Sequence, residues 1–310
     1  MKREAAMITV AGEALMDLLV SASGAVTVNP GGAPFNVART VAALGTDCQF
    51  LGRLSDDAFG RRLRAALEDR GVRLAAPAAA GHPTTLAVAE LDAAGVADYR
   101  FYLEGTSAGQ LEGSDVPADV WVRTRALALG GLGLLLEPMA STLMTVLRAA
   151  PATATVLVDP NCRPRAISDL PAYRVAVEAF LAHADLVKVS VEDLALLHPD
   201  LDVDAAARAV VGRGPSAVLV TAGPDPVTIH TARELRRLPV PAVDVVDTVG
   251  AGDGFVAGLL SWWVEHHCTP DQAGDIDTLV PATEAAVAVS AAVCTAAGAD
   301  LPESFLWTRA

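Results

Sequence analysis

The 310-residue sequence contains very little lysine and few aromatic side chains. Lys2 and Lys188 are its only lysines, and aromatic residues make up 5% of the chain. The fingerprint GxxxxGK(S/T), in which a lysine and a Gly-rich loop bind phosphates, does not occur in it. The sequence therefore excludes a P-loop nucleotide site.

Cysteine and positive charge are also scarce. Cys48, Cys162, Cys268 and Cys294 are widely separated and form no CxxC pair, which disfavours a disulfide framework or a zinc ribbon. The formal net charge is −14, so the chain lacks the basic surface that nucleic acids or anionic membranes attract. We therefore expect no nucleic-acid or membrane partner.

Long apolar runs are absent as well. No stretch approaches 18 uninterrupted apolar residues, the length that predicts a membrane span. The first residues, MKREAAMITVAGEAL, contain an apolar stretch that Gly12 and Glu13 interrupt, which is too short for the core of a signal peptide. These features together predict a cytoplasmic protein.

What the sequence does contain is a regular alternation of strand and helix patterns. A hydrophobic content of 52% can bury one large core, and we find no linker, which predicts a single α/β domain over residues 1–310. The alternation is typical of a mostly parallel sheet with helices on both faces. Strands are expected at 7–12, 48–54, 126–131, 155–160, 186–190, 217–223 and 228–231, and helices at 34–45, 59–71, 139–150, 173–184, 191–198, 204–214, 253–267 and 283–298.

Two segments break this alternation. Residues 84–103 predict two strands around a turn near Ala93 to Gly95, and residues 14–32 are extended and rich in turn residues. Hairpins inserted into an α/β chain often form flaps that close over ligands. We expect a small β-sheet lid formed by segments about 14–32 and 84–106.

The stretch VVDTVGAGDGF, residues 245–255, combines an anion site with an acid. A Gly-rich turn that opens a helix attracts anions, because its backbone N–H groups are free. Asp253 suits such a place if it accepts a proton from the nucleophile during phosphoryl transfer. The alternative, that Asp253 is a helix N-cap, stays open at this point. Gly250, Gly252 and Gly254 form GxGxG and not GxGxxG, which disfavours a dehydrogenase.

Two motifs resemble those of a known family. DTVGAGDGFVAGLL resembles the C-terminal signature of the ribokinase-like (PfkB) carbohydrate kinases, and GGAPFNVARTVAALG followed by LGRLSDDAFGRRL resembles their N-terminal signature. The resemblance covers essentially the whole chain in the expected order. It implies a ribokinase-like fold and transfer of the γ-phosphoryl group of ATP to a hydroxymethyl oxygen of a small sugar.

The resemblance also implies the residues of the sugar side. Asp253 matches the catalytic base, and the backbone of Gly250, Ala251 and Gly252 matches the anion hole. A carboxylate such as Asp17 can accept two hydrogen bonds from a diol. The residues that match or adjoin the family's substrate contacts are Asp17, Gly31, Gly32, Asn36, Tyr102, Asn161 and Arg163. For Arg163, a loop salt bridge is the alternative.

On the nucleotide side the matching residues are Lys188, Ser190, Thr221, Gly223 and Gly252. The motif KVSVED places Asp193 where the family organises Mg²⁺, and we expect contact through water because Mg²⁺ keeps several of its waters. Asp247 and Val249 match a K⁺ loop, which carbonyl groups of residues 288–297 would complete. Pro224 and Pro226 remove two N–H donors from the nucleotide-side turn.

Several motifs that resemble those of the fructokinase and 2-keto-3-deoxygluconate kinase branches bear on the substrate. DPNxR at 159–163, GEALMDLL and LLLEPM favour fructose, although Leu103 stands where many fructokinases carry arginine. The alternatives are 2-keto-3-deoxygluconate, ribose or a nucleoside. A non-catalytic sensor of sugar or nucleotide is a different class of hypothesis, and the retained Asp253 argues against it. We expect sugar and ATP as small-molecule partners and a homodimer formed through the lid.

Overall fold

The computed structural model describes residues 6–79, 81–91 and 97–307 and contains two β-sheets. The larger sheet has nine strands in the order β13-β12-β11-β10-β9-β8-β1-β4-β5. The seven strands β11, β10, β9, β8, β1, β4 and β5 are parallel to one another. Strands β12 and β13 pair antiparallel at the β11 edge. Their bounds are β1 Met7–Ala11, β4 Asp47–Leu51, β5 Arg73–Leu74, β8 Thr124–Gly130, β9 Thr155–Asp159, β10 Leu186–Ser190, β11 Ala217–Ala222, β12 Asp225–Thr231 and β13 Leu235–Leu238.

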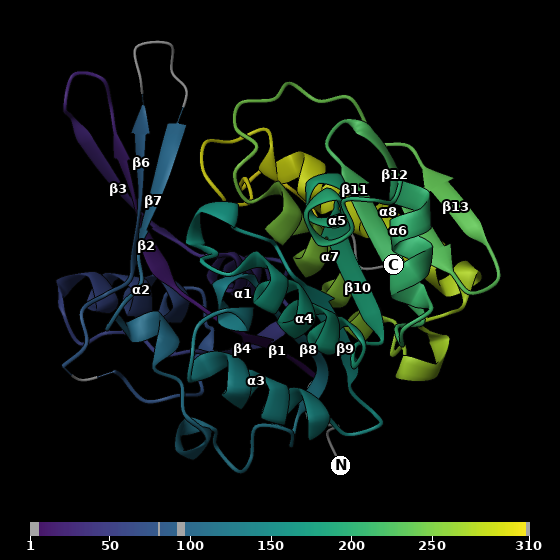
Figure 1. Ribbon diagram of the computed structural model, residues 1–310, viewed down its shortest axis with the longest axis horizontal. Helices are drawn as coiled ribbons and strands as arrows, with labels where there is room; N and C mark the ends of the chain where they lie inside the picture. Colours follow the sequence, from purple (N-terminus) through teal and green to yellow (C-terminus); the bar gives the residue numbers. More distant parts are fainter. Residues whose placement is uncertain (1–5, 80, 92–96, 308–310) are drawn as a thin grey trace.

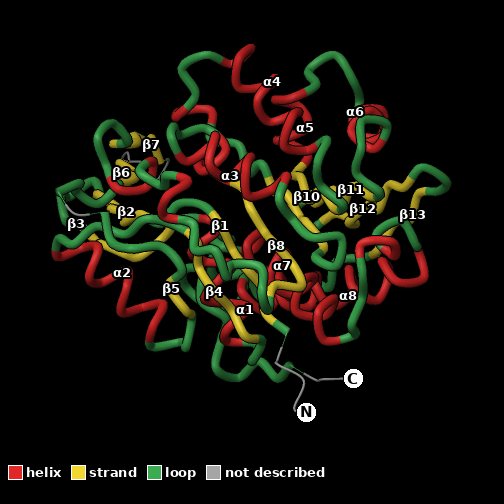
Figure 2. The backbone as a smooth tube through the Cα atoms, turned by 90° about the horizontal axis from the view of Figure 1, so that it is seen from below, coloured by secondary structure: helices red, strands yellow, loops and turns green. Residues whose placement is uncertain are grey.

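Helices cover both faces of this sheet, as Figure 2 shows. One face carries α1 Ala33–Ala43, α2 Ala58–Glu68, α7 Ala251–Glu265 and α8 Ile276–Val293, and the other carries α3 Met139–Arg148, α4 Leu170–Leu181, α5 Val191–Leu197 and α6 Val203–Val211. Each face has its own buried core: Phe35 and Trp263 lie in the first, Leu143 and Val177 in the second. This arrangement confirms the predicted α/β class and its two helical layers.

The main departures from the predicted elements are at α8 and the sheet edges. The prediction began the last helix at residue 283, whereas α8 begins at Ile276 and contains Pro281. The Asp275 side chain accepts the N–H of Asp277 at the start of α8, and the burial of Leu279 and Ala282 favours the extra turns. The short, charged strands β5 and β13 were missed. By length and composition alone α8 could span a membrane, but 56% of it is buried in the protein, as in a core helix.

The smaller sheet has four strands in the order β3-β2-β6-β7 and stands to one side of the main sheet (Figure 1). Its strands are β2 Leu15–Val20, β3 Val26–Gly31, β6 Leu86–Leu91 and β7 Ala97–Tyr102. They come from the two segments from which the lid was expected, and we call this sheet the lid. The turn predicted near Ala93 to Gly95 lies outside the described residues.

The strand order places a crevice beside β1. Strand β4 continues the chain on one side of β1, and β8, β9, β10 and β11 follow in order on the other side. In open parallel sheets, ligands bind beyond the carboxyl ends of the strands where the order reverses. A ligand site is therefore expected at the ends of β1, β8 and β9.

Candidate active site

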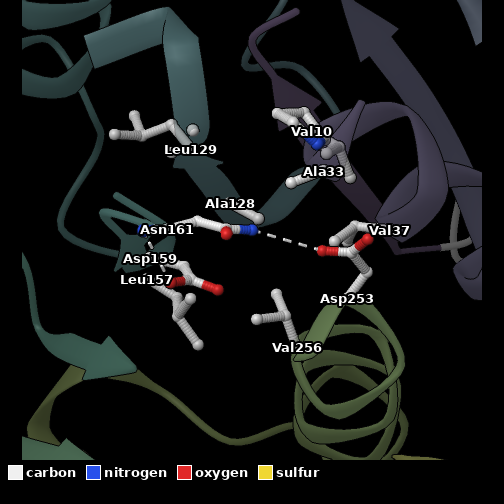
Figure 3. Close-up of a pocket in the computed structure, with 13 residues that line it drawn as sticks. Val10, Ala33, Val37, Ala128, Leu129, Leu157, Asp159, Asn161, Asp253 and Val256 are labelled. Atoms are coloured by element: carbon white, nitrogen blue, oxygen red, sulfur yellow. Dashed lines mark hydrogen bonds between the residues drawn. The ribbon is translucent and has the colours of Figure 1, made fainter. Parts of the chain in front are cut away.

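A small pocket lies at these strand ends, between α1 and the start of α7 (Figure 3). Its lining is largely apolar apart from Asp159, Asn161 and Asp253, and the other lining residues are Val10, Ala33, Pro34, Val37, Ala128, Leu129, Gly130, Gly131, Leu157 and Val256. A Cβ on Gly130 would lie 1.8 Å from the carbonyl oxygen of Asp159, so only glycine lets these two strand ends approach. The pocket thus presents two carboxylates and one amide on an otherwise apolar surface.

Asp253 is the third residue of α7 and is 7% exposed. Its Oδ2 accepts a hydrogen bond of 2.8 Å from Asn36 Nδ2. Its Oδ1 lies 3.5 Å from Asn161 Nδ2, as Figure 3 shows. The helix N-cap is Gly250, and α7 has no side-chain cap. The alternative that Asp253 caps its own helix is therefore wrong, and its carboxylate faces the pocket.

Burial raises the pKa of Asp253 to about 7. This value is the net result: the charge of Asp159 acts in the same direction as burial, while the hydrogen bond from Asn36 and the charge of Lys188 lower the pKa. A general base works best when its pKa lies near the working pH. Asp253 has that property at neutral pH.

The turn before Asp253 exposes backbone donors. Gly250 has φ 79°, a left-handed conformation that favours glycine, and α7 begins directly after it. The N–H of Ala251 donates to the Thr248 carbonyl at 3.2 Å. The next two N–H groups of the helix, those of Gly252 and Asp253, have no acceptor within the helix and are the donors suited to an anion.

Lys188 and Asp159 form a buried ion pair beneath this turn. Lys188 is 4% exposed, and its Nζ lies 2.9 Å from Asp159 Oδ2. A Cβ on Gly252 would meet Lys188 Nζ at 2.9 Å, so the ammonium group lies against the first turn of α7. Burial alone would lower the pKa of Lys188, but Asp159 and Asp193 raise it, and the lysine stays charged. Asp159 was not among the predicted site residues, although an acid at the end of a buried strand was a usable signal.

Asp17 and Gly31 lie side by side in the lid. A Cβ on Gly31 would lie 1.9 Å from Asp17 Oδ2, so the glycine makes room for the carboxylate. Burial raises the pKa of Asp17 to about 6, against the opposing charge of Arg163. Gly32, with φ 104°, is the N-cap of α1 and joins the lid to the helix that carries Asn36. Asp17 lies outside the residues that line the pocket.

Asn161 and Arg163 follow β9. Asn161 has φ 41°, an uncommon value for a residue other than glycine, and it sits next to Asp253. Arg163 is exposed and donates to Asn161 Oδ1 and to the carbonyl oxygens of Asn161 and Cys162. Its charge acts on Asp17 and Asp253. No carboxylate partner of Arg163 occurs among the described residues, so the alternative of a loop salt bridge finds no support. Tyr102, at the end of β7, is 50% exposed and does not line the pocket.

Glu13 is a second buried acid that was not among the predicted site residues. It follows β1, is 3% exposed, and its Oε2 accepts the Gly133 N–H at 3.1 Å. Burial raises its pKa, with the hydrogen bonds and Arg163 opposing. Gly131 leaves room for it, because a Cβ there would lie 2.4 Å from Oε1. Glu13 thus holds the turn that forms one wall of the pocket.

Ser190 and Asp193 form the capping box of α5. Asp193 Oδ1 accepts the Cys162 N–H at 2.8 Å and Oδ2 accepts the Ser190 N–H at 2.9 Å. Within residues 6–79, 81–91 and 97–307, no group of three His, Cys, Asp or Glu side chains could hold a metal ion. One carboxylate with spare lone pairs still fits Mg²⁺, which takes most of its ligands from water and phosphates.

Thr221 and Gly223 mark the end of β11. Thr221 Oγ1 donates to the Val189 carbonyl at 3.4 Å, and Gly223, with φ 59°, turns the chain into β12. A Cβ on Gly223 would meet nothing within 4 Å, so this turn borders open space. Neither residue lines the pocket at Asp253.

Asp247 connects the loop before α7 to the segment after α8. Its Oδ1 accepts the Val249 N–H at 3.0 Å and its Oδ2 the Gly298 N–H at 2.9 Å. The Cys294 carbonyl accepts the Val246 N–H at 2.8 Å. Two backbone segments therefore cross here, and their remaining carbonyl oxygens are the kind of donor that suits a hard cation.

Three comparisons with known proteins place the chain among sugar kinases. The profile of the family described as "pfkB family carbohydrate kinase" matches residues 5–305. The chain is 35% identical to a fructokinase from Klebsiella pneumoniae over 302 residues, which cover 94% of each chain. Among solved structures, it superposes on fructokinase from Xylella fastidiosa with bound ATP with a TM-score of 0.84 and 28% identity, over 94% of this chain and 93% of that one.

A third relative carries sugar and nucleotide together. This is a double mutant of fructokinase from Vibrio cholerae O395 in a form with bound fructose, ADP and potassium ion. The chain matches it with a TM-score of 0.81 and 25% identity, over 95% of this chain and 94% of that one. The fold is therefore that of sugar kinases.

Proposed function

The chain belongs to the pfkB family of carbohydrate kinases, and from this premise we propose that it transfers the γ-phosphoryl group of ATP to a hydroxymethyl oxygen of fructose. The enzyme is a phosphotransferase with an alcohol as acceptor. Its similarity to fructokinases along most of the chain supports fructose as that alcohol. The observation that carries the proposal is the buried Asp253 carboxylate, which Asn36 holds at the helix N-terminus.

In this proposal Asp253 is the general base. Its Oδ2 is engaged by Asn36 at 2.8 Å, whereas Oδ1 is 3.5 Å from its nearest amide and is the freer acceptor. Oδ1 accepts the proton of the sugar hydroxyl while the hydroxyl oxygen attacks the γ-phosphorus of ATP. The bond from the γ-phosphorus to the bridging oxygen breaks, and ADP leaves. The Gly250-Ala251-Gly252 turn, through the free N–H groups at the start of α7, holds the negative charge of the transferred group.

The sugar lies between Asp253 and the lid. Asp17 accepts hydrogen bonds from sugar hydroxyls, Asn36 orients the base, and Asn161 and Arg163 border the sugar from the β9 side. Gly31 and Gly32 let the substrate approach the backbone, and Tyr102 lies on the lid strand next to it. Closure of the lid excludes water and limits wasteful hydrolysis of ATP.

ATP occupies the side of β10 and β11, where Lys188, Ser190, Thr221 and Gly223 lie. Lys188 stabilises the phosphates by its charge. Mg²⁺, when bound, neutralises phosphate charge, and Asp193 would hold it through water. K⁺ would bind where the Asp247 and Val249 loop crosses the segment after α8.

We further propose a cytoplasmic homodimer that assembles through the lid. The lid exposes large apolar side chains, with Leu19 at 39%, Val26 at 53% and Tyr99 at 46% exposure. Exposed edges and faces of a small sheet favour pairing with another chain. Sedimentation of the purified protein tests this assembly.

The decisive experiment is a turnover assay with the purified protein, ATP and Mg²⁺. We expect ADP release with fructose and much less with 2-keto-3-deoxygluconate, ribose or a nucleoside. If one of these compounds had a higher kcat/KM than fructose, that compound would be the substrate. Sugar binding in the absence of any ADP release would instead support the non-catalytic sensor.

A further inference from the structure

Asp57 lies in the motif LGRLSDDAFG, to which the proposed mechanism gives no role. It is the N-cap of α2, where its Oδ1 accepts the Gly60 N–H at 2.7 Å. Asp169 and Asp202 cap α4 and α6 in the same way. A cap of this kind stabilises a helix and by itself suggests no further function.

Asp57 differs from the other two caps because it also binds a distant segment. Its Oδ2 accepts the backbone N–H of Thr84 at 2.8 Å, and its Oδ1 accepts the Thr84 hydroxyl at 2.6 Å. Thr84 is 4% exposed and lies just before β6, where the chain enters the lid. The carboxylate thus ties a helix of the main domain to the root of a lid strand.

The surrounding hydrogen bonds strengthen this connection. Ser55 Oγ accepts the Asp57 N–H at 3.1 Å and donates to the His82 carbonyl at 2.7 Å. The hydroxyls of Thr85 and Thr106, at the entry and exit of the β6–β7 hairpin, form a hydrogen bond of 2.7 Å. Burial would raise the pKa of Asp57, but the hydrogen bonds from Thr84, Gly60 and Ser55 outweigh it and lower that pKa, so the bonds are charge-assisted.

The position of β6 determines the position of Asp17. Strands β2 and β6 are parallel, with Asp17 aligned with Ala87, and the Met16 N–H donates to the Thr85 carbonyl at 3.0 Å. The β2 and β3 side of the lid is held by packing, because Met16 is fully buried and Leu18 and Val28 pack against the core of the main domain. The Asp57–Thr84 link adds a hydrogen-bonded anchor on the β6 side.

We propose that Asp57 is a positioning residue for the sugar site: through Thr84 it fixes β6, and through β6 it fixes the Asp17 carboxylate of the neighbouring strand relative to Asp253. The inference rests on the proposed function, in which Asp17 binds the sugar. Loss of the link affects sugar binding and leaves the nucleotide side in place, because Lys188 and Asp193 lie on other elements.

The test compares Thr84→Val with Thr84→Ser, and uses Asp202→Ala as a control that removes a helix cap with no lid contact. Thr84→Val removes the hydroxyl bond and retains the Asp57 cap of α2. We expect its KM for fructose to rise about ten-fold, since a hydrogen bond to a charged group is lost, while the KM for ATP stays within about two-fold. Thr84→Ser should restore the fructose KM, and Asp202→Ala should lower only the melting temperature.

A fructose KM that is unchanged in Thr84→Val, or that rises together with the KM for ATP, overturns the proposal. A second measurement does not require activity. Amide hydrogen exchange of residues 15–20 in the ligand-free protein should be faster in Thr84→Val than in the wild type or in Asp202→Ala. If the wild-type protein phosphorylates no sugar, the proposed function fails, and unchanged exchange in residues 15–20 separately overturns the positioning role.

Discussion

The carboxylate of Asp17 occupies the space that a side chain at residue 31 would need. A Cβ on Gly31 would lie 1.9 Å from Asp17 Oδ2, and this oxygen is the end of a flexible side chain. The fold can therefore accept a methyl group at residue 31 if the Asp17 carboxylate turns away. Stability and sugar binding should respond differently to that change.

Gly31→Ala is expected to raise the KM for fructose about ten-fold, because it displaces an acid that can accept two hydrogen bonds from sugar hydroxyls. The melting temperature should change little, since Gly31 is not among the glycines with positive φ. Gly113→Ala is the matched control, because a Cβ there meets nothing within 4 Å. Steady-state kinetics decide the question, and an unchanged fructose KM in Gly31→Ala would place the sugar away from Asp17.

Asp253→Asn should lower kcat by roughly 10³-fold, the usual contribution of a positioned general base. The amide cannot accept the proton, but its oxygen can still accept the hydrogen bond from Asn36, so the site keeps its shape. Calorimetric titration should show fructose and ATP affinities close to those of the wild type. Turnover near the wild-type rate would remove Asp253 from the mechanism.

The pH dependence of activity should follow the same carboxylate. Because the pKa of Asp253 is raised to about 7, the group is protonated and inactive as a base at lower pH. We expect kcat/KM for fructose to fall as the pH drops below about 7, with Asp17 adding to the loss near its pKa of about 6. A profile that stays flat between pH 5.5 and 8.5, roughly the range in which both groups titrate, would contradict this assignment.

Asp253 should also make the free energy of unfolding depend on pH. Activity falls as the pH drops, whereas stability falls as the pH rises. Its folded pKa of about 7 lies above the ordinary 3.8, so the folded state binds more protons between these values. The stabilisation is complete below the ordinary pKa and is lost as the pH rises through about 7. Asp253→Asn does not titrate, so its free energy of unfolding relative to the wild type should rise by on the order of 2 kcal/mol from pH 5 to pH 8. Urea unfolding at the two pH values measures this difference, and an equal effect at both would be inconsistent with the raised pKa.

Much of the fold could be predicted from local patterns. The buried strands that end near the pocket, such as β9 and β10, have apolar runs that predict them directly. Helix α7 was expected because its Gly-rich start and apolar body lie in one stretch of sequence. The first part of α8 was not expected. It contains Pro281, which is unfavourable inside a helix, and the cap at Asp275 and the packing of Leu279 stabilise these turns nevertheless.

Contacts between distant residues could not be predicted in this way. Asp159 and Lys188 pair only because β9 and β10 are neighbours in the sheet, and no spacing in the sequence encodes that distance. The steric role of Gly31 likewise depends on the pairing of β2 with β3. The motifs identified Asp253, whereas the fold had to supply the groups that tune its pKa.

The Asp159–Lys188 pair makes a final prediction that separates stability from function. Lys188→Met leaves the Asp159 carboxylate buried without its partner, and breaking a buried ion pair in this way typically costs about 3–5 kcal/mol of unfolding free energy. The double variant Lys188→Met with Asp159→Asn removes both charges, so most of that loss should be recovered. Turnover should not recover, because the ammonium group against the first turn of α7 is absent in both variants. Chemical unfolding gives the first result, and kcat with the KM for ATP gives the second. If the double variant recovered turnover as well as stability, Lys188 would have a structural role only, and other groups would neutralise the phosphate charge.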